Sequence, residues 1–189
     1  MPAQSTVTKR QASAERTRER MIDAGLLLAE QTSLAELSVN LIVAEAGVAK
    51  GSFFHHFGDR TGYLIALHRR FHEELLLATR LATENVQPGR ERLRVGAIAY
   101  LDVCLRGPGG RALVLEARAE PVIVDEVVAR TLSNAKLLVA DFRALGRKYP
   151  LPSARLWLGL VAEAALVELE AGRRNPAVRS ALVAFITTS

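Results

Sequence analysis

The chain has 189 residues, of which 49% are hydrophobic, and a formal net charge of +5. That length and apolar content supply a core for one or two compact domains and exclude a disordered chain. No apolar run approaches the roughly 18 residues of a membrane span, and the opening residues are polar. We therefore expect a cytoplasmic protein with no membrane partner and no signal peptide.

The first twenty residues carry an excess of positive charge, with five Lys and Arg side chains against two Glu. We predict that residues 1–13 form a basic flexible arm. Such a cluster suits a polyanion, because each neutralised phosphate releases counterions, although a solvated tail has the same composition.

Helical periodicity recurs along the N-terminal third of the chain. Apolar residues spaced three and four apart predict a first helix over 14–31. Ser38 is a suitable N-cap for a short second helix that ends at Gly47. A third short helix is expected over 50–56, and a long fourth one begins after the N-cap Asp59 and continues to about residue 82.

The C-terminal part has the same helical character between Gly and Pro breakers. Helices are expected there over 89–105, 109–119, 121–147, 153–172 and 175–187. Strand-like alternation is absent, so the sequence predicts an all-α fold of about nine helices.

A short helix, a glycine and a second short helix form a helix-turn-helix in the stretch Val43–Leu67. Gly47 can adopt the left-handed conformation that such a turn requires. The second helix opens with Ala49, Lys50 and Gly51, which include no large apolar side chain, so this end faces outward. A DNA major groove accepts one helix of this kind.

The block AGVAKGSFFHHF, residues 46–57, places glycines, aromatics and a histidine in a specific register. From Arg20 to Leu67 the sequence resembles the N-terminal domain of TetR-family (TetR/AcrR) transcriptional regulators. The resemblance implies a helix-turn-helix DNA-binding domain at 14–60. Helix four then joins it to a helical ligand-binding and dimerisation domain at 61–189.

The resemblance also implies which residues meet DNA. Lys50, Ser52, His55 and Arg60 match positions near phosphates or bases, and Asn40 and Phe53 match positions near base edges. An Asn amide can pair with adenine, whereas Phe53 offers only apolar contact to a thymine methyl and is equally well explained as a core aromatic. The complete expected DNA-binding set is Asn40, Ala49, Lys50, Gly51, Ser52, Phe53, Phe54, His55 and Arg60.

Two of the departures from the family pattern bear directly on DNA contact. Phe54 stands where the family usually has Tyr, so a hydroxyl that commonly reaches a phosphate is missing. Ala49 replaces the usual capping Ser, which costs about 1 kcal/mol unless another group accepts from the helix amides. A DNA phosphate could be that group.

By this resemblance we expect a homodimeric, ligand-responsive repressor that binds a palindromic double-stranded operator and is released by a small molecule. Inward faces of the C-terminal helices supply the candidate ligand-binding residues. Core packing explains all of them except Arg118 equally well. The candidates are Tyr100, Cys104, Arg118, Phe142 and Trp157.

The wide apolar stripe on helix 153–172 predicts the dimer interface, formed with helix 175–187 as a four-helix bundle about a two-fold axis. The expected contacts are Leu156, Leu160, Ala164 and Val167. The alternative is that this stripe faces the subunit's own core, while Val161 and Glu168 face the partner.

Two other functions compete with this interpretation. His68 and His72 have the i, i+4 spacing of a zinc site, but no cysteine lies near them. An all-helical enzyme would have to use Glu116, Glu163 or Cys104, which lack an assembled nucleophile and base. We therefore expect no metal, no cofactor and no catalytic residue.

Overall fold

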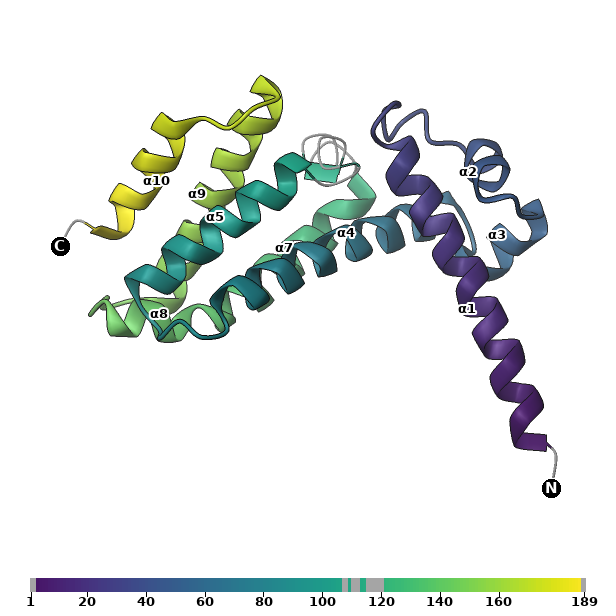
Figure 1. Cartoon of the computed structure of the whole chain (residues 1–189), viewed down its shortest axis with the longest axis horizontal. Coiled ribbons are helices and arrows are strands. Elements are labelled where there is room, and N and C mark those ends of the chain that lie inside the picture. Colours follow the sequence, from purple (N-terminus) through teal and green to yellow (C-terminus); the bar gives the residue numbers. More distant parts are fainter. Residues whose placement is uncertain (1–2, 107–108, 110–112, 115–120, 188–189) are drawn as a thin grey trace.

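The computed structural model describes residues 3–106, 109, 113–114 and 121–187, and this part of the chain is helical without strands (Figure 1). The all-α class is confirmed. The expected helix over 109–119 lies largely outside the described residues. The helices are α1 (Ala3–Leu28), α2 (Val39–Ala46), α3 (Lys50–Phe57), α4 (Arg60–Thr83), α5 (Arg90–Arg106), α7 (Pro121–Leu137), α8 (Val139–Ala144), α9 (Pro150–Ala171) and α10 (Pro176–Thr187).

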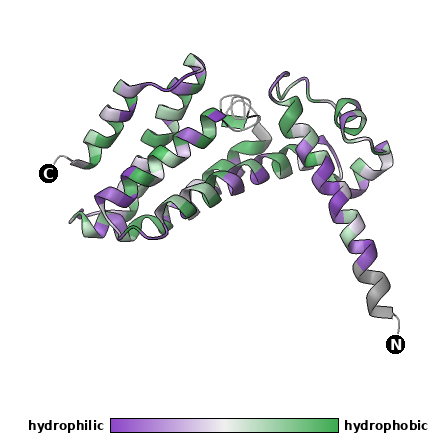
Figure 2. Cartoon of the chain, in the orientation of Figure 1, coloured by the Kyte–Doolittle hydropathy of each residue, from purple (hydrophilic) through white to green (hydrophobic). Residues whose placement is uncertain are grey.

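Helix α1 begins at Ala3, well before the predicted start at residue 14. The segment expected as a flexible arm therefore forms, from Ala3 onward, the first turns of this helix. No Gly or Pro interrupts the chain between Ala3 and Gly25, and Ala, Gln, Glu and Arg in this stretch favour helix. Its N-terminal half projects away from the rest of the chain, and the apolar residues gather at its C-terminal end (Figure 1 and Figure 2).

The predicted helix caps are confirmed. The Ser38 hydroxyl accepts from the Leu41 amide at 3.3 Å and so caps α2. Gly47 ends α2 with a φ of 60°, the left-handed conformation that glycine adopts without strain. Asp59 caps α4 through the Gly62 amide at 2.8 Å.

The long helix α4 connects the two ends of the molecule (Figure 1). Its first turns pack against α1 and α3, while its later turns lie along α5 and α7. Helix α9 packs in turn against α5, α7 and α8. Buried apolar residues run through both parts as one continuous core.

The single helix predicted over 121–147 is wrong, because the chain breaks at Leu138 into α7 and α8. A tertiary contact accounts for the break. Asp141 of α8 is fully buried and accepts from the Gly89 amide at 2.9 Å and from two nitrogens of Arg92 at 2.6 Å each. These bonds hold α8 at the start of α5. No Gly or Pro near Leu138 marks this break in the sequence.

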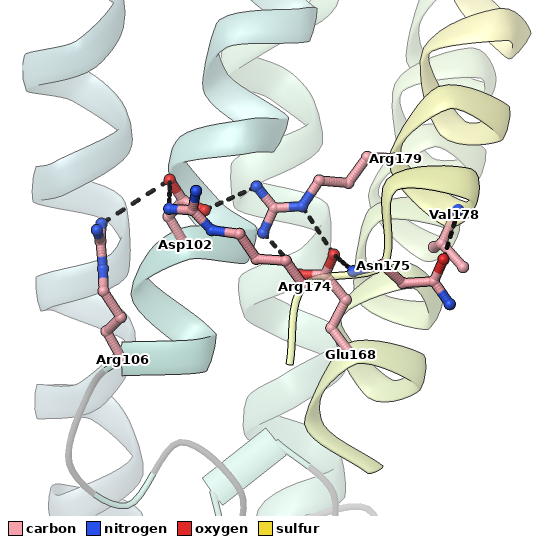
Figure 3. Close-up of polar contacts among 7 residues, drawn as sticks. All are labelled: Asp102, Arg106, Glu168, Arg174, Asn175, Val178 and Arg179. Carbon is pink, nitrogen blue, oxygen red and sulfur yellow. Dashed lines mark hydrogen bonds and ion pairs between the residues drawn. The ribbon is translucent and has the colours of Figure 1, made fainter. Parts of the chain in front are cut away.

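Helix α10 is fastened to α9 and α5 by a network of charged side chains (Figure 3). Buried Glu168 of α9 accepts from Arg179 of α10 twice at 2.7 Å and from the Asn175 amide at 2.8 Å. Arg179 also donates to Asp102 of α5 at 2.7 Å, and Arg174 donates to the other oxygen of Asp102 at 3.0 Å. The α9–α10 hairpin is thus fixed by charge as well as by apolar contact.

Within the described ranges, no helix combines the length and the apolar character needed to cross a membrane.

Candidate nucleic-acid interface and ligand cavity

Helix α3 presents one face to the core and the other to solvent. Phe53 is completely buried, with its ring 5.3 Å from that of Phe57 and 5.1 Å from that of Tyr63. The prediction that Phe53 lies near base edges is therefore wrong, and the alternative of a core aromatic holds. Lys50 and His55 lie on the exposed face.

The N-terminus of α3 has no side-chain cap, as the sequence predicted. Ala49 has the extended conformation of an N-cap residue, with φ −71° and ψ 143°, but no side-chain oxygen accepts from the first turn. The amides of this turn carry the positive end of the helix dipole. Gly51 follows in the same turn with no described atom within 4 Å of where a Cβ would stand, so a large group can approach the backbone.

A polar hollow of about 450 Å³ lies between α1 and α3. Helix α1 contributes a cation and two hydroxyls to it, and α3 contributes part of its exposed face. The lining residues are Arg10, Ser13, Ala14, Thr17, Gly51, Ser52, His55 and His56. The extended start of α1 and the outer face of α3 therefore form one surface.

The remaining exposed positions extend this surface. Asn40 is exposed in the first turn of α2, and its amide can take part in hydrogen bonds with a partner. Phe54 is 46% exposed on α3, although it is a large apolar side chain.

Arg60 has a different role from the predicted one. Its Nε donates to the Leu37 carbonyl at 3.0 Å, and a terminal nitrogen donates to the carbonyls of Leu34 and Ala35. These bonds hold the loop that connects α1 to α2. The phosphate contact predicted for Arg60 is corrected, because its guanidinium is committed to backbone carbonyls.

Arg20 is a functional residue that the sequence did not single out. A terminal nitrogen donates to the Ala46 carbonyl at 2.5 Å and approaches the Gly47 carbonyl at 3.3 Å. Arg20 therefore clamps the helix-turn-helix turn to α1. Arg16 and Arg18 lie just before it in sequence, so nothing local distinguishes Arg20 from the cations of a solvated arm.

Helix α4 is tied to α1 by a buried tyrosine. The Tyr63 hydroxyl donates to the Met21 carbonyl at 2.7 Å, and burial raises the pKa of this phenol, so it stays protonated. The close approach depends on Gly25, where a Cβ would stand 1.9 Å from the Tyr63 oxygen. The same Tyr63 ring packs against Phe53 and Phe57 of α3, so α1, α3 and α4 meet at this residue.

The C-terminal bundle encloses a cavity of about 370 Å³ between α4, α5, α7 and α9. Tyr100 and Trp157 line it, as expected of ligand-binding candidates. Cys104 and Phe142 are buried elsewhere in the core and do not line it, which corrects both of these predictions. Arg118 lies outside the described residues.

The sequence missed several polar residues of this cavity. They come from α4 and α7 and are hidden in ordinary amphipathic patterns, so only the folded arrangement brings them together. These residues are His68, His72 and Thr79 on α4, and Arg130, Thr131 and Asn134 on α7.

The zinc alternative finds no support. Within the described part of the chain, no three His, Cys, Asp or Glu side chains are placed to hold a metal. The Arg130 guanidinium lies 3.0 Å from Nδ1 of His68 and would repel a second cation. Burial, aided by the charge of Arg130, lowers the pKa of His68 to about 4, so this imidazole is neutral at physiological pH.

The enzyme candidates are not assembled into a site either. Burial raises the pKa of the Cys104 thiol to about 12, which keeps it from acting as a thiolate nucleophile. Glu163 is exposed on α9, and Glu116 lies outside the described residues.

The proposed dimer stripe on α9 is split between surface and core. Leu156 is 73% exposed, whereas Ala164 is buried within its own chain, so its assignment as an interface contact is corrected. Val161 and Glu168 are also buried, which shows that the alternative set is wrong. Leu160 and Val167 are half-buried, and Phe185 of α10 adds a 59% exposed aromatic ring.

Comparison with known proteins identifies the N-terminal unit. Residues 21–67 match the family of bacterial regulatory proteins, tetR family. The HTH-type transcriptional regulator BetI of Paraburkholderia phymatum is 35% identical over 88 residues, which is 46% of this chain and 44% of BetI. The match therefore spans less than half the length of this curated relative.

Solved structures share the fold over nearly the whole chain. A putative TetR-family transcriptional regulator from Rhodococcus sp. has a TM-score of 0.76 at 20% identity, covering 92% of this chain and 100% of that one. RolR in complex with resorcinol has a TM-score of 0.67 at 16% identity, covering 95% and 91% of the two chains. Residues 21–67 therefore form an N-terminal domain of the tetR family of bacterial regulatory proteins, and the chain as a whole shares its fold with solved TetR-family regulators.

Proposed function

We propose that the chain is a DNA-binding transcriptional repressor that acts as a homodimer on a palindromic operator and is released by a small molecule. The observation that carries the proposal is the open N-terminus of α3. Its amides lack a side-chain cap, Lys50 is exposed beside them, and Arg10 of α1 lines the adjoining hollow. A phosphate of the DNA backbone supplies the acceptor that Ala49 cannot.

The electrostatic part of this proposal is tested with Lys50→Ala and random-sequence duplex DNA. Each lost phosphate contact reduces the dependence of log K on log salt, so the slope should fall by about one to two units per dimer. Lys136→Ala is the matched control, since Lys136 is exposed on α7, far along the chain from α3. An unchanged slope for Lys50→Ala removes this residue from the interface.

Base reading is tested at Asn40. Selection from a randomised duplex library with the parent protein defines the preferred site, and the same selection is repeated with Asn40→Ala. We expect the variant to lose preference at one position of each half-site while its salt slope stays the same, because an Asn amide pairs with adenine and neutralises no phosphate. Equal weakening on all sequences contradicts the base-reading role.

The cavity in the C-terminal bundle supports control by a small molecule. Its volume of about 370 Å³ falls in the range of about 300–1,000 Å³ typical of small-molecule sites. RolR, which has the same fold, was solved with resorcinol bound. Helix α4 lines the cavity and also packs against α1 and α3, so one helix touches both the ligand site and the DNA-binding unit.

Dimerisation through α9 and α10 is supported by the exposed apolar residues of these helices. Leu156→Glu combined with Phe185→Glu places charges where a second subunit would pack. Because both side chains are exposed, we expect a folded monomer by sedimentation and circular dichroism, with weakened binding to a palindromic duplex. Leu81→Glu is the control, since Leu81 is 61% exposed on α4. A double variant that stays dimeric refutes this interface.

A further inference from the structure

The cavity of the C-terminal bundle is mostly apolar. Leucine, valine and alanine side chains form most of its wall, from Leu75 and Leu76 on α4 to Val161 and Ala162 on α9. A ligand that fills such a space needs an apolar body.

Three arginines interrupt the apolar wall, and the half-buried Arg130 is the one of interest here. Arg130 of α7 lines the cavity, and burial lowers the pKa of its guanidinium. An arginine nevertheless stays charged, so the protein holds a positive charge in a poorly solvated place.

The described part of the chain offers Arg130 very little compensation. Its one described hydrogen bond joins a terminal nitrogen to Nδ1 of His68 at 3.0 Å, although a guanidinium carries five N–H donors. Tyr100 of the cavity wall and Glu126, one turn earlier on α7, both raise the pKa of Arg130 through electrostatic interaction, but Arg69 holds both oxygens of the Glu126 carboxylate at 2.9 and 2.7 Å. A buried charge with so few partners is stabilised by an anion.

The two histidines next to Arg130 share its poorly solvated surroundings. Burial, together with the positive charge of Arg130, lowers the pKa of His68 to about 4 and that of His72 to about 2. Neither imidazole therefore carries charge at neutral pH. Arg92, a second cation of the wall, is already paired with Asp141 through two hydrogen bonds. Arg80, the third, is exposed at the cavity edge.

We propose that this cavity binds a small molecule with an apolar body and a single carboxylate, whose two oxygens pair with the Arg130 guanidinium. Two parallel N–H···O bonds match the planar fork of arginine. One negative charge matches Arg130, to which no carboxylate is bonded in the described part of the chain, whereas a dianion would bring a second charge into an apolar space. This inference rests on the function proposed above only in that it uses the same cavity.

Binding of this kind also reaches α4 directly. Arg130 is bonded through one terminal nitrogen to His68, which lies on the helix that carries the DNA-binding unit, so a carboxylate that draws the guanidinium away from His68 acts on α4. A ligand can shift a conformational equilibrium only through contacts that differ between the two states. The Arg130–His68 bond is such a contact, because it is present without the anion and replaced with it.

The proposal is tested by titrating the full-length protein, without DNA, with three ten-carbon probes: decanoate, decan-1-ol and decylamine. Trp157 lines the cavity and is the only tryptophan, so its fluorescence reports occupancy, and calorimetry gives the affinities. A hydrogen-bonded charge pair contributes about 1.5–3 kcal/mol, so decanoate should bind about 10- to 100-fold more tightly than decan-1-ol. Decylamine should bind most weakly.

Two variants assign the preference to a residue. Arg130→Met keeps the length of the side chain and removes the charge, and it should bring decanoate and decan-1-ol to equal affinity. Arg80→Met removes an exposed cation of the same cavity and should leave the preference unchanged.

Equal binding of the three probes by the parent protein overturns the proposal, and this result needs no variant. Absence of saturable decanoate binding overturns it as well, as does a preference that survives Arg130→Met. Since no DNA is present, these results do not depend on operator binding, and a failure of the Lys50 and Asn40 experiments leaves them intact.

Discussion

Replacing Gly25 by alanine tests how α4 is held on α1. The new Cβ would stand 1.9 Å from the Tyr63 hydroxyl oxygen, 3.0 Å from its Cζ and 3.1 Å from a methyl of Leu67. Tyr63 is fully buried and cannot swing into solvent without leaving a hole in the core. The substitution must therefore break the Tyr63–Met21 hydrogen bond or shift one helix against the other.

The expected cost follows from three contributions. Alanine favours helix over glycine by about 1 kcal/mol. Loss of a hydrogen bond to a buried acceptor costs about 1–3 kcal/mol, and overpacking costs about 1–3 kcal/mol. The variant should be less stable by roughly 1–5 kcal/mol, which for a chain of this size lowers Tm by about 2–20 °C.

The measurement is urea or thermal unfolding at fixed protein concentration, because a dimer's Tm depends on concentration. Gly51→Ala is the matched control, since no described atom lies within 4 Å of its added Cβ. Tyr63→Phe in the Gly25→Ala background removes the closest atom and should recover at least about 1 kcal/mol of the loss. A Gly25→Ala protein as stable as its parent would refute the role assigned to this contact.

Three further outcomes are expected. Cys104, with a thiol pKa raised by burial to about 12, should resist alkylation at pH 8 in the native protein and react fully in urea; rapid native labelling would contradict its burial. Burial raises the pKa of Glu168, but the hydrogen bonds from Arg179 and the Asn175 amide outweigh burial, so the pKa in the folded protein is lowered. The stability that Glu168 contributes is therefore fully present above about pH 4.3, the value of an unperturbed Glu, and is lost as pH falls through the lowered folded pKa. Glu168→Gln should make the free energy of unfolding depend less steeply on pH in the acid range. A dependence as steep as in the parent would show that the network contributes little. Arg60→Met should lower Tm and leave the salt slope of DNA binding unchanged, whereas a smaller slope would restore the phosphate role to Arg60.

Local signals predicted the N-terminal unit well. Ser38, Gly47 and Asp59 act through their immediate neighbours, so capping rules predicted α2 and the start of α4 correctly. The uncapped start of α3 at Ala49 was predictable for the same reason.

Long-range contacts account for what the sequence did not show. Asp141 breaks a predicted helix through partners 49 and 52 residues away, and Arg20 holds a turn 26 residues beyond it. The sequence left two roles for Phe53, contact with a base and packing in the core, since periodicity in an eight-residue helix does not decide which face is buried. Arg130 lies among ordinary polar residues of α7, and only packing against α4 turns it into a cavity residue.

The charge network of α9 and α10 constrains how this sequence can drift over generations. Glu168 is 1% exposed, so losing Arg179 alone would strand a buried carboxylate, a change that typically costs about 3–5 kcal/mol. Exchanging both residues for apolar side chains of similar volume can be neutral. A substitution of only one of the two residues should therefore be selected against, whereas a paired substitution can persist. Close relatives should carry either the charged pair or an apolar pair. Asp102, which shares Arg179 with Glu168, keeps Arg174 as a partner and can therefore stay acidic in those relatives where Arg179 is gone.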